Sequence, residues 1–253
     1  SLFDYAYDGN ITNIKVKNAY VKADDTEVNT PMIGGLGGDV INVNIDNCSV
    51  ENSTVIGKTN SLGGIIGEVT GASTYFSMKN CFAKNVTMQD GCYIGGLVGY
   101  INQSDSSNRT AIIKNCYAEV IYNTTNKYLI NTSYVGAISG IIQTKYPVLI
   151  ENVYSVLKVN NSVDKKLIAG NLVGIEKSQD LKLNNVYYNS QTSGLTIDMK
   201  EEGKVTRNNV EGMTTDVMKS PSSSADNLIN KLKKEGVPSN KIIEIIIDTF
   251  KEN

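Results

Sequence analysis

The chain has 253 residues, with 24 Lys and Arg against 26 Asp and Glu, 14 Tyr, no His and no Trp. A net charge of −2 leaves no basic surface for nucleic acid, so we expect no nucleic-acid partner. Without His, imidazole acid–base catalysis, Ser-His and Cys-His nucleophiles and His-ligated zinc are excluded. No apolar run approaches the roughly 20 residues of a membrane-spanning helix, so no membrane span is expected.

Two short patterns alternate along residues 1–190, and both recur every 29 to 41 residues in the same order. Such a shared period predicts a repeat protein. The first pattern is a glycine line, seen as "MIGGLGG", "SLGGIIG", "YIGGLVG", "YVGAISG" and "LIAGNLVG", which end at Gly38, Gly67, Gly99, Gly140 and Gly174. The second is an asparagine line such as "IDNCSV" or "IKNCYA", centred on Asn18, Asn47, Asn80, Asn115, Asn152 and Asn185.

The composition of each repeat favours β-strands, because Val, Ile, Thr and Tyr are frequent and helical periodicity is missing. A unit of about 30 residues is too short for the four strands of a propeller blade, so we predict two or three short strands per turn. The chain is therefore expected to be all-β, a parallel β-solenoid (β-helix) of about six coils. Strict alternation in "IKNCYAEV" would place Ile113, Asn115, Tyr117 and Glu119 on one face, with Lys114, Cys116, Ala118 and Val120 on the other.

The two patterns receive structural interpretations. The glycine lines match neither a dinucleotide fingerprint nor a P-loop, so we expect them at sharp turns with positive φ or where backbones approach closely. The asparagine column is expected to stack one residue per coil, with the amides bonding to each other or to turn backbone. A polar ligand-binding strip remains the alternative for this column.

Three cysteines, Cys48, Cys81 and Cys116, each follow a column asparagine. Other repeats carry Ala19, Val153 or Val186 at that position, which indicates a small apolar core site, so we expect buried, reduced thiols. No C-x-x-C pair is present, which leaves no support for a redox motif or a four-thiolate zinc site. We therefore assign no metal-binding and no cofactor-binding residues.

Acidic residues gather in two places, at Asp24, Asp25 and Glu27 and at Glu201 and Glu202. Polysaccharide-cleaving enzymes use paired carboxylates, which a β-helix would have to gather on one face. These acids fall in predicted loops and do not recur in register, so we expect solvated loops and assign no catalytic residue. The insertion "NQSDSSNRT", residues 102–110, and the first acidic loop are the expected places for any partner binding.

The C-terminal part changes in character. Residues 191–221 are expected to form an exit strand and a linker. Helical spacing of apolar residues then predicts two short helices within 222–253, the second capped by Ser239. These helices would cap the solenoid or begin a further domain.

The glycine lines "LGGIIGEV" and "IGGLVGYI", each followed by a strand like "IKNCYA", closely resemble the GLUG repeats of bacterial cell-surface proteins. Such repeats occur in the N-terminal regions of immunoglobulin A protease-type zinc metallopeptidases and in adhesin-like proteins. The resemblance covers residues 1 to about 219 and implies a right-handed β-helix in a secreted or wall-attached bacterial protein. It also implies an accessory role beside a catalytic or anchoring domain. Without His, the metallopeptidase motif H-E-x-x-H is not in this chain.

We therefore expect a non-catalytic spacer or binding domain for adhesion or substrate recognition, and a monomer. It would be a piece of a larger protein, because the chain opens within a repeat and shows no signal peptide. A host protein or a glycan is the expected kind of partner, and its binding residues are not assigned. The alternative is a polysaccharide lyase or hydrolase built on the β-helix.

Overall fold

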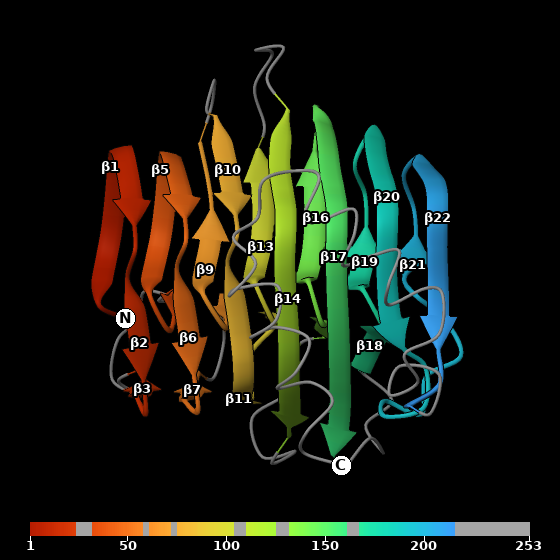
Figure 1. Ribbon diagram of the computed structural model, residues 1–253, viewed down its shortest axis with the longest axis horizontal. Coiled ribbons are helices and arrows are strands. Elements are labelled where there is room, and N and C mark those ends of the chain that lie inside the picture. The colour runs from red at the N-terminus through yellow and green to blue at the C-terminus, as the bar shows by residue number, and fades with distance from the viewer. Residues whose placement is uncertain are drawn as a thin grey trace.

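The computed structural model describes residues 1–23, 32–57, 61–71, 75–103, 110–124, 132–160 and 167–215. This part of the chain is almost entirely β-strand, arranged in one sheet of 17 strands and one of five. The strands stand side by side along the long axis of the molecule, with β1 near one end and β22 near the other (Figure 1). Because neighbouring strands run parallel and come from successive repeats, the fold is the predicted β-solenoid.

The five-stranded sheet contains the first half of each glycine line. Its strands stack in chain order and mark four turns of the chain. The predicted count of about six coils is therefore too high, since the first and last repeats add strands only to the large sheet. The five strands are β4 (Ile33–Gly34), β8 (Ser61–Gly63), β12 (Tyr93–Gly95), β15 (Ser133–Gly136) and β18 (Leu167–Gly170).

The large sheet contains the rest of each turn. One row begins with four strands that contain the last glycine of a line, and a fifth strand, β21, pairs with the last of them: β9 (Ile66–Val69), β13 (Val98–Gln103), β16 (Ser139–Thr144), β19 (Val173–Glu176) and β21 (Lys200–Glu201). A second row holds the longer strands: β1 (Phe3–Thr12), β5 (Gly37–Asp46), β10 (Phe76–Lys79), β14 (Ala111–Asn123), β17 (Pro147–Asn160), β20 (Asp180–Asn189) and β22 (Val205–Met213). Shorter strands complete the first turns: β2 (Lys15–Lys17), β3 (Tyr20–Lys22), β6 (Ser49–Glu51), β7 (Thr54–Ile56) and β11 (Phe82–Gln89).

The asparagine column bends the long strands. Asn80, Asn115, Asn152 and Asn185 all adopt positive φ, between 51° and 55°. Asparagine reaches this left-handed region more easily than other non-glycine residues. Their side chains form the predicted ladder, with Nδ2 of Asn115, Asn152 and Asn185 donating to Oδ1 of the preceding asparagine at 3.1–3.2 Å.

Asn18, however, lies outside this column, contrary to the sequence alignment. Lys17 pairs with Glu51, so Asn18 is level with Asn52 and not with Asn47. Asn13 occupies the column position instead, and Nδ2 of Asn47 donates to its Oδ1. The cause is a second bend in the early turns, at Asn18, Asn52 and Asn85, where φ is again positive, at 54°, 48° and 50°.

The bend at Asn115 also breaks the expected alternation. Ile113 packs in the same core cluster as Cys116, Ala118 and Val120, which were predicted to face the other way. A left-handed residue inserted in a strand shifts the alternation by one, so the inward positions differ before and after it. The prediction was wrong because it assumed one unbroken strand.

The glycine lines have a different role from the asparagines. None of their glycines is among those with positive φ, so that expectation was wrong. Close approach is what requires glycine: a Cβ on Gly96 would lie 2.1 Å from the Ala137 carbonyl oxygen, and one on Gly99 would lie 2.5 Å from that of Gly67. The lines are therefore places where backbones of adjacent turns touch.

The main core is a column of apolar side chains along the solenoid that includes three of the cysteines, and Tyr187 and Met213 form a second, small cluster. Cys48, Cys81 and Cys116 are at most 3% exposed, and all are free thiols. Cys116 pairs in register with Val153, as predicted. Ala19 is not in this column, because the first repeat is shifted and Ile14 follows the column asparagine there.

The predicted helices in 222–253 lie outside the described residues, as does 216–221 of the expected linker. The described part of 191–221 contributes β21 and β22 to the large sheet, with β22 stacked on β20.

Candidate functional site

The acids singled out from the sequence fall partly outside the described residues. Asp24, Asp25 and Glu27 lie outside the described residues, as do positions 104–109 of the insertion. Glu201 and Glu202 are described, and both are engaged in ion pairs.

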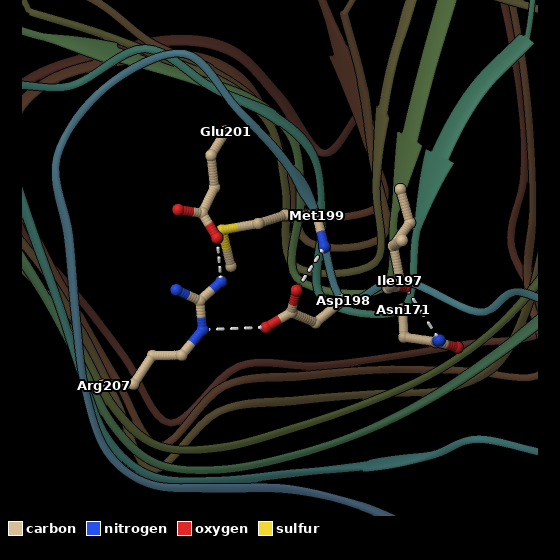
Figure 2. A network of polar contacts seen from close by, with 6 residues as sticks. All are labelled: Asn171, Ile197, Asp198, Met199, Glu201 and Arg207. Carbon is tan, nitrogen blue, oxygen red and sulfur yellow. Dashed lines mark hydrogen bonds and ion pairs between the residues drawn. The ribbon is translucent and has the colours of Figure 1, made fainter.

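Glu201 belongs to a network at the C-terminal turn (Figure 2). The Arg207 guanidinium lies between Glu201 and Asp198, with Nε 3.0 Å from Asp198 Oδ2. Glu202 contacts Lys200 at 2.8 Å and Lys177 at 3.2 Å, and its hydrogen bond to Lys200 lowers its pKa. Neighbouring Lys and Arg side chains therefore neutralise these carboxylates, and the ion pairs hold the segments of the C-terminal turn together.

A carboxylate pair does occur elsewhere. Asp39 on β5 and Glu68 on β9 are direct register partners on adjacent turns. The sequence interpretation considered only acids in predicted loops, so this in-register pair was not predicted. A signal was present in the sequence, because Asp39 directly follows Gly38 and Glu68 directly follows Gly67, the last glycines of two consecutive lines.

Both carboxylates are hydrogen-bonded and poorly solvated. Thr70 Oγ1 donates to Asp39 at 2.8 Å, and Ser61 Oγ donates to Glu68 Oε2 at the same distance. Burial raises the pKa of Asp39. Burial also raises the pKa of Glu68, which is only 6% exposed, and the nearby charge of Asp39 raises it further.

Tyrosines occupy the equivalent position on the next turn and also lie on the strands of the five-stranded sheet. Tyr100, the residue after Gly99, pairs in register with Glu68. Tyr93 on β12 and Tyr134 on β15 are register partners with stacked rings, their centroids 5.8 Å apart. The Tyr93 and Tyr100 centroids are 4.9 Å apart. We call Tyr93, Tyr100 and Tyr134 the tyrosine face.

The glycine line between the two strands brings these rings together. A Cβ on Gly95 would lie 1.9 Å from the Val98 carbonyl oxygen, so β12 turns into β13 more sharply than a side chain would allow. Tyr93 and Tyr100, on either side of this turn, can therefore meet. The glycines are visible in the sequence, but their role in joining two outward columns was not predicted from it.

Polar groups border the tyrosine face. Tyr100 Oη donates to Gln143 Oε1 at 3.2 Å, and Asn102 hydrogen-bonds to Glu68. Burial, followed by the charge of Glu68, raises the pKa of Tyr100 to about 12, so the phenol stays protonated at neutral pH. Half-buried rings beside amide and carboxylate groups offer an apolar stacking surface together with hydrogen-bonding groups.

A separate hollow of about 490 Å³ lies near the C-terminal turns. Aliphatic side chains such as Leu167, Ile168 and Ile197 line most of it, and Lys200 is its charged residue. Because Lys200 is paired with Glu202, this hollow offers less directed polar contact than the tyrosine face.

Within the described ranges, no three or more Cys, Asp or Glu side chains gather where they could hold a metal ion. None of these segments forms a helix of the length and apolar character needed to cross a bilayer. No protein-family model, no curated protein and no solved structure matches this chain.

Proposed function

We propose that the chain is a non-catalytic β-solenoid binding domain and that the tyrosine face binds a glycan. The observation that carries the proposal is the grouping of Tyr93, Tyr100 and Tyr134 on adjacent turns, beside Glu68. Aromatic rings with a polar hydroxyl can stack on the apolar face of a sugar and also hydrogen-bond to its hydroxyl groups. Asn102, Gln143 and Glu68 supply further polar groups at the border.

The proposal extends to the setting of the domain. The glycine and asparagine lines resemble GLUG repeats, which supports a secreted or wall-attached bacterial protein. There the solenoid would act as a spacer that carries the tyrosine face, for adhesion or as the substrate-recognition region beside a peptidase.

Calorimetric titration with a panel of neutral and acidic oligosaccharides tests the binding. Replacing Tyr93 or Tyr134 with Ala should weaken binding of a recognised glycan about threefold to tenfold, the scale of one aromatic contact. Tyr20→Ala is the matched control, because Tyr20 is 69% exposed and lies on β3, away from the tyrosine face. Unchanged affinity in both variants, or an equal loss in the control, would contradict the proposal.

Glycan cleavage is the second candidate function, and the Asp39–Glu68 pair is the observation that favours it. Parallel strands lie about 4.8 Å apart, and retaining glycosidases hold their two carboxyl groups about 5–5.5 Å apart. A group with a raised pKa, such as Glu68, could serve as the general acid.

One assay distinguishes glycan binding from glycan cleavage. Each oligosaccharide is incubated with the wild-type chain and with Asp39→Asn and Glu68→Gln, and reducing ends are counted alongside binding. The binding proposal expects no product from any form and retained affinity in Asp39→Asn, since Asp39 is not among the groups assigned to the glycan. Steady product release that both substitutions abolish would establish the enzyme.

A further inference from the structure

The two terminal strands of the described solenoid both have an unpaired edge. In this part of the chain, β1 pairs with β5 alone and β22 with β20 alone. On β1, Tyr5 and Tyr7 are 56% and 62% exposed, and most residues of β22 are exposed as well. Such edges carry unsatisfied backbone donors and acceptors and are templates for pairing with another strand.

The asparagine ladder gives these two edges opposite hydrogen-bonding character. Along the column, each of four asparagine amides donates to the asparagine of the preceding turn, from Asn209 back to Asn185 and on to Asn80. Asn47 donates to Asn13 in the same direction. Among the described contacts, Asn13 therefore keeps its Nδ2 donor unused and Asn209 keeps its Oδ1 acceptor unused.

We propose that the chain associates head to tail, with the β1 edge of one copy adding in parallel to the β22 edge of another. In this register Asn13 of one copy lies over Asn209 of the next, and its free Nδ2 meets the free Oδ1. Both residues adopt the same bend, at φ 60° and 58°, so the path of the chain continues across the junction.

The side chains around the two bends are also complementary. Two residues past Asn13 is the exposed Lys15, and two residues past Asn209 is the exposed Glu211, so the junction brings opposite charges together. One residue past each bend, Ile14 meets Val210, and both are only partly buried against the core of their own copy.

Arg207 is compatible with this junction. The register partners that begin with Ile11 on β1 end with Arg207 on β22. If the Arg207 guanidinium had no partner, burying its charge in the junction would be unfavourable. The guanidinium is already held between Asp198 and Glu201 (Figure 2). Its aliphatic stem is therefore left to face Ile11 of the neighbouring copy.

A head-to-head dimer lacks these matches. Two β1 edges would then meet, so lysines of one copy would lie against lysines of the other and the Asn13 amide donors would face each other. The two β1 strands would also run antiparallel, which interrupts the parallel stacking of the solenoid. Head-to-tail contact is heterologous and does not close on itself, so the expected product is an open series of oligomers. The inference therefore departs from the monomer expected from the sequence.

Sedimentation velocity of the whole chain over a range of concentrations tests the association. The wild-type chain should form concentration-dependent oligomers with no preferred dimer. Lys15→Glu and Glu211→Lys should each weaken association about fivefold, the upper range for one surface pair, and the double variant should restore it. A wild-type chain that stays monomeric, or a double variant no better than the singles, would overturn the proposal.

Cross-linking fixes the orientation. Lys15→Cys and Glu211→Cys chains, mixed under mild oxidation, should form a covalent heterodimer, because side chains in register on adjacent strands lie within disulfide reach. Neither chain alone should cross-link efficiently. Lys158→Cys, on the exposed side of β17, replaces Lys15→Cys in the control mixture, which should stay monomeric. A homodimer of Lys15→Cys would show head-to-head association, and a cross-linked control would show random collision; either result overturns the proposal.

Discussion

The asparagine column and the glycine lines recur with the same period, yet they solve different geometric problems. The column asparagines adopt positive φ and bend the strand, while their amides bind the turns above and below. No glycine of the glycine lines has a positive φ. Because these residues lack a side chain, the backbones of adjacent turns can come into contact there. Glycine is usually assumed at positive φ, but here asparagine fills that role because its side chain adds a hydrogen bond.

The largest expected effect is at the glycine line. Gly96→Val should destabilise the fold by about 3 kcal/mol or more, because its Cβ would overlap the Ala137 carbonyl oxygen, a backbone atom that cannot move aside. Thermal and denaturant unfolding measure the loss. Gly9→Val is the control, since a Cβ on Gly9 meets nothing within 4 Å, and it should stay within about 0.5 kcal/mol of the parent. Equal stability of the two variants would contradict the close-approach role.

Replacements at the asparagine column should separate its two contributions. Asn152→Ala removes ladder bonds on both sides of a buried residue and forces Ala into the left-handed region, at an expected cost of about 2–3 kcal/mol. Asn152→Gly should recover about 1 kcal/mol, because glycine accepts positive φ without restoring the amide.

The reverse exchange sharpens the comparison. Gly96→Asn should be as damaging as Gly96→Val, although asparagine suits the other column, because Gly96 needs space and not positive φ. If Gly96→Asn is tolerated while Asn152→Gly is not, the two roles have been assigned the wrong way round.

The repeat period, the parallel strands and the cysteine column could be predicted from the sequence, because stacking makes equivalent residues coincide. The registers of the first repeat could not, since Asn13 and Asn18 both sit in plausible strands and only the second bend decides between them. The carboxylate pair and the tyrosine face were missed for a related reason. Asp39, Glu68 and Tyr100 all follow a last glycine, but a column of such different residues does not look like a repeat.

The cysteine column should be chemically silent in the folded chain. Burial raises the pKa of the Cys81 thiol, and Cys48 and Cys116 are nearly as buried. Thiol titration of the native chain should therefore label these three slowly, and labelling should become fast in denaturant. Rapid labelling of all three in the native chain would contradict the register that places them beside the column asparagines.

The smallest effect is expected at Glu68, the residue after a last glycine. Because folding raises its pKa, the folded chain binds this proton more tightly than the unfolded chain does. Its stabilising contribution is therefore complete below the ordinary Glu pKa and is lost as pH rises through the raised value. Glu68→Gln carries no charge and accepts the same Ser61 hydrogen bond, so it should escape this loss.

Denaturant unfolding at a series of pH values measures the difference. The Glu68→Gln and wild-type stabilities should agree in acid and diverge above the ordinary Glu pKa, with the variant the more stable of the two at neutral pH. Glu202→Gln gives a control of opposite sign, because Lys200 lowers the Glu202 pKa and the wild-type carboxylate is the stabilising form at neutral pH. Parallel curves for wild type and Glu68→Gln would mean that Glu68 is solvated in the folded chain. The carboxylate beside the tyrosine face would then be an ordinary surface acid, and the case for a general acid at this position would fail with it.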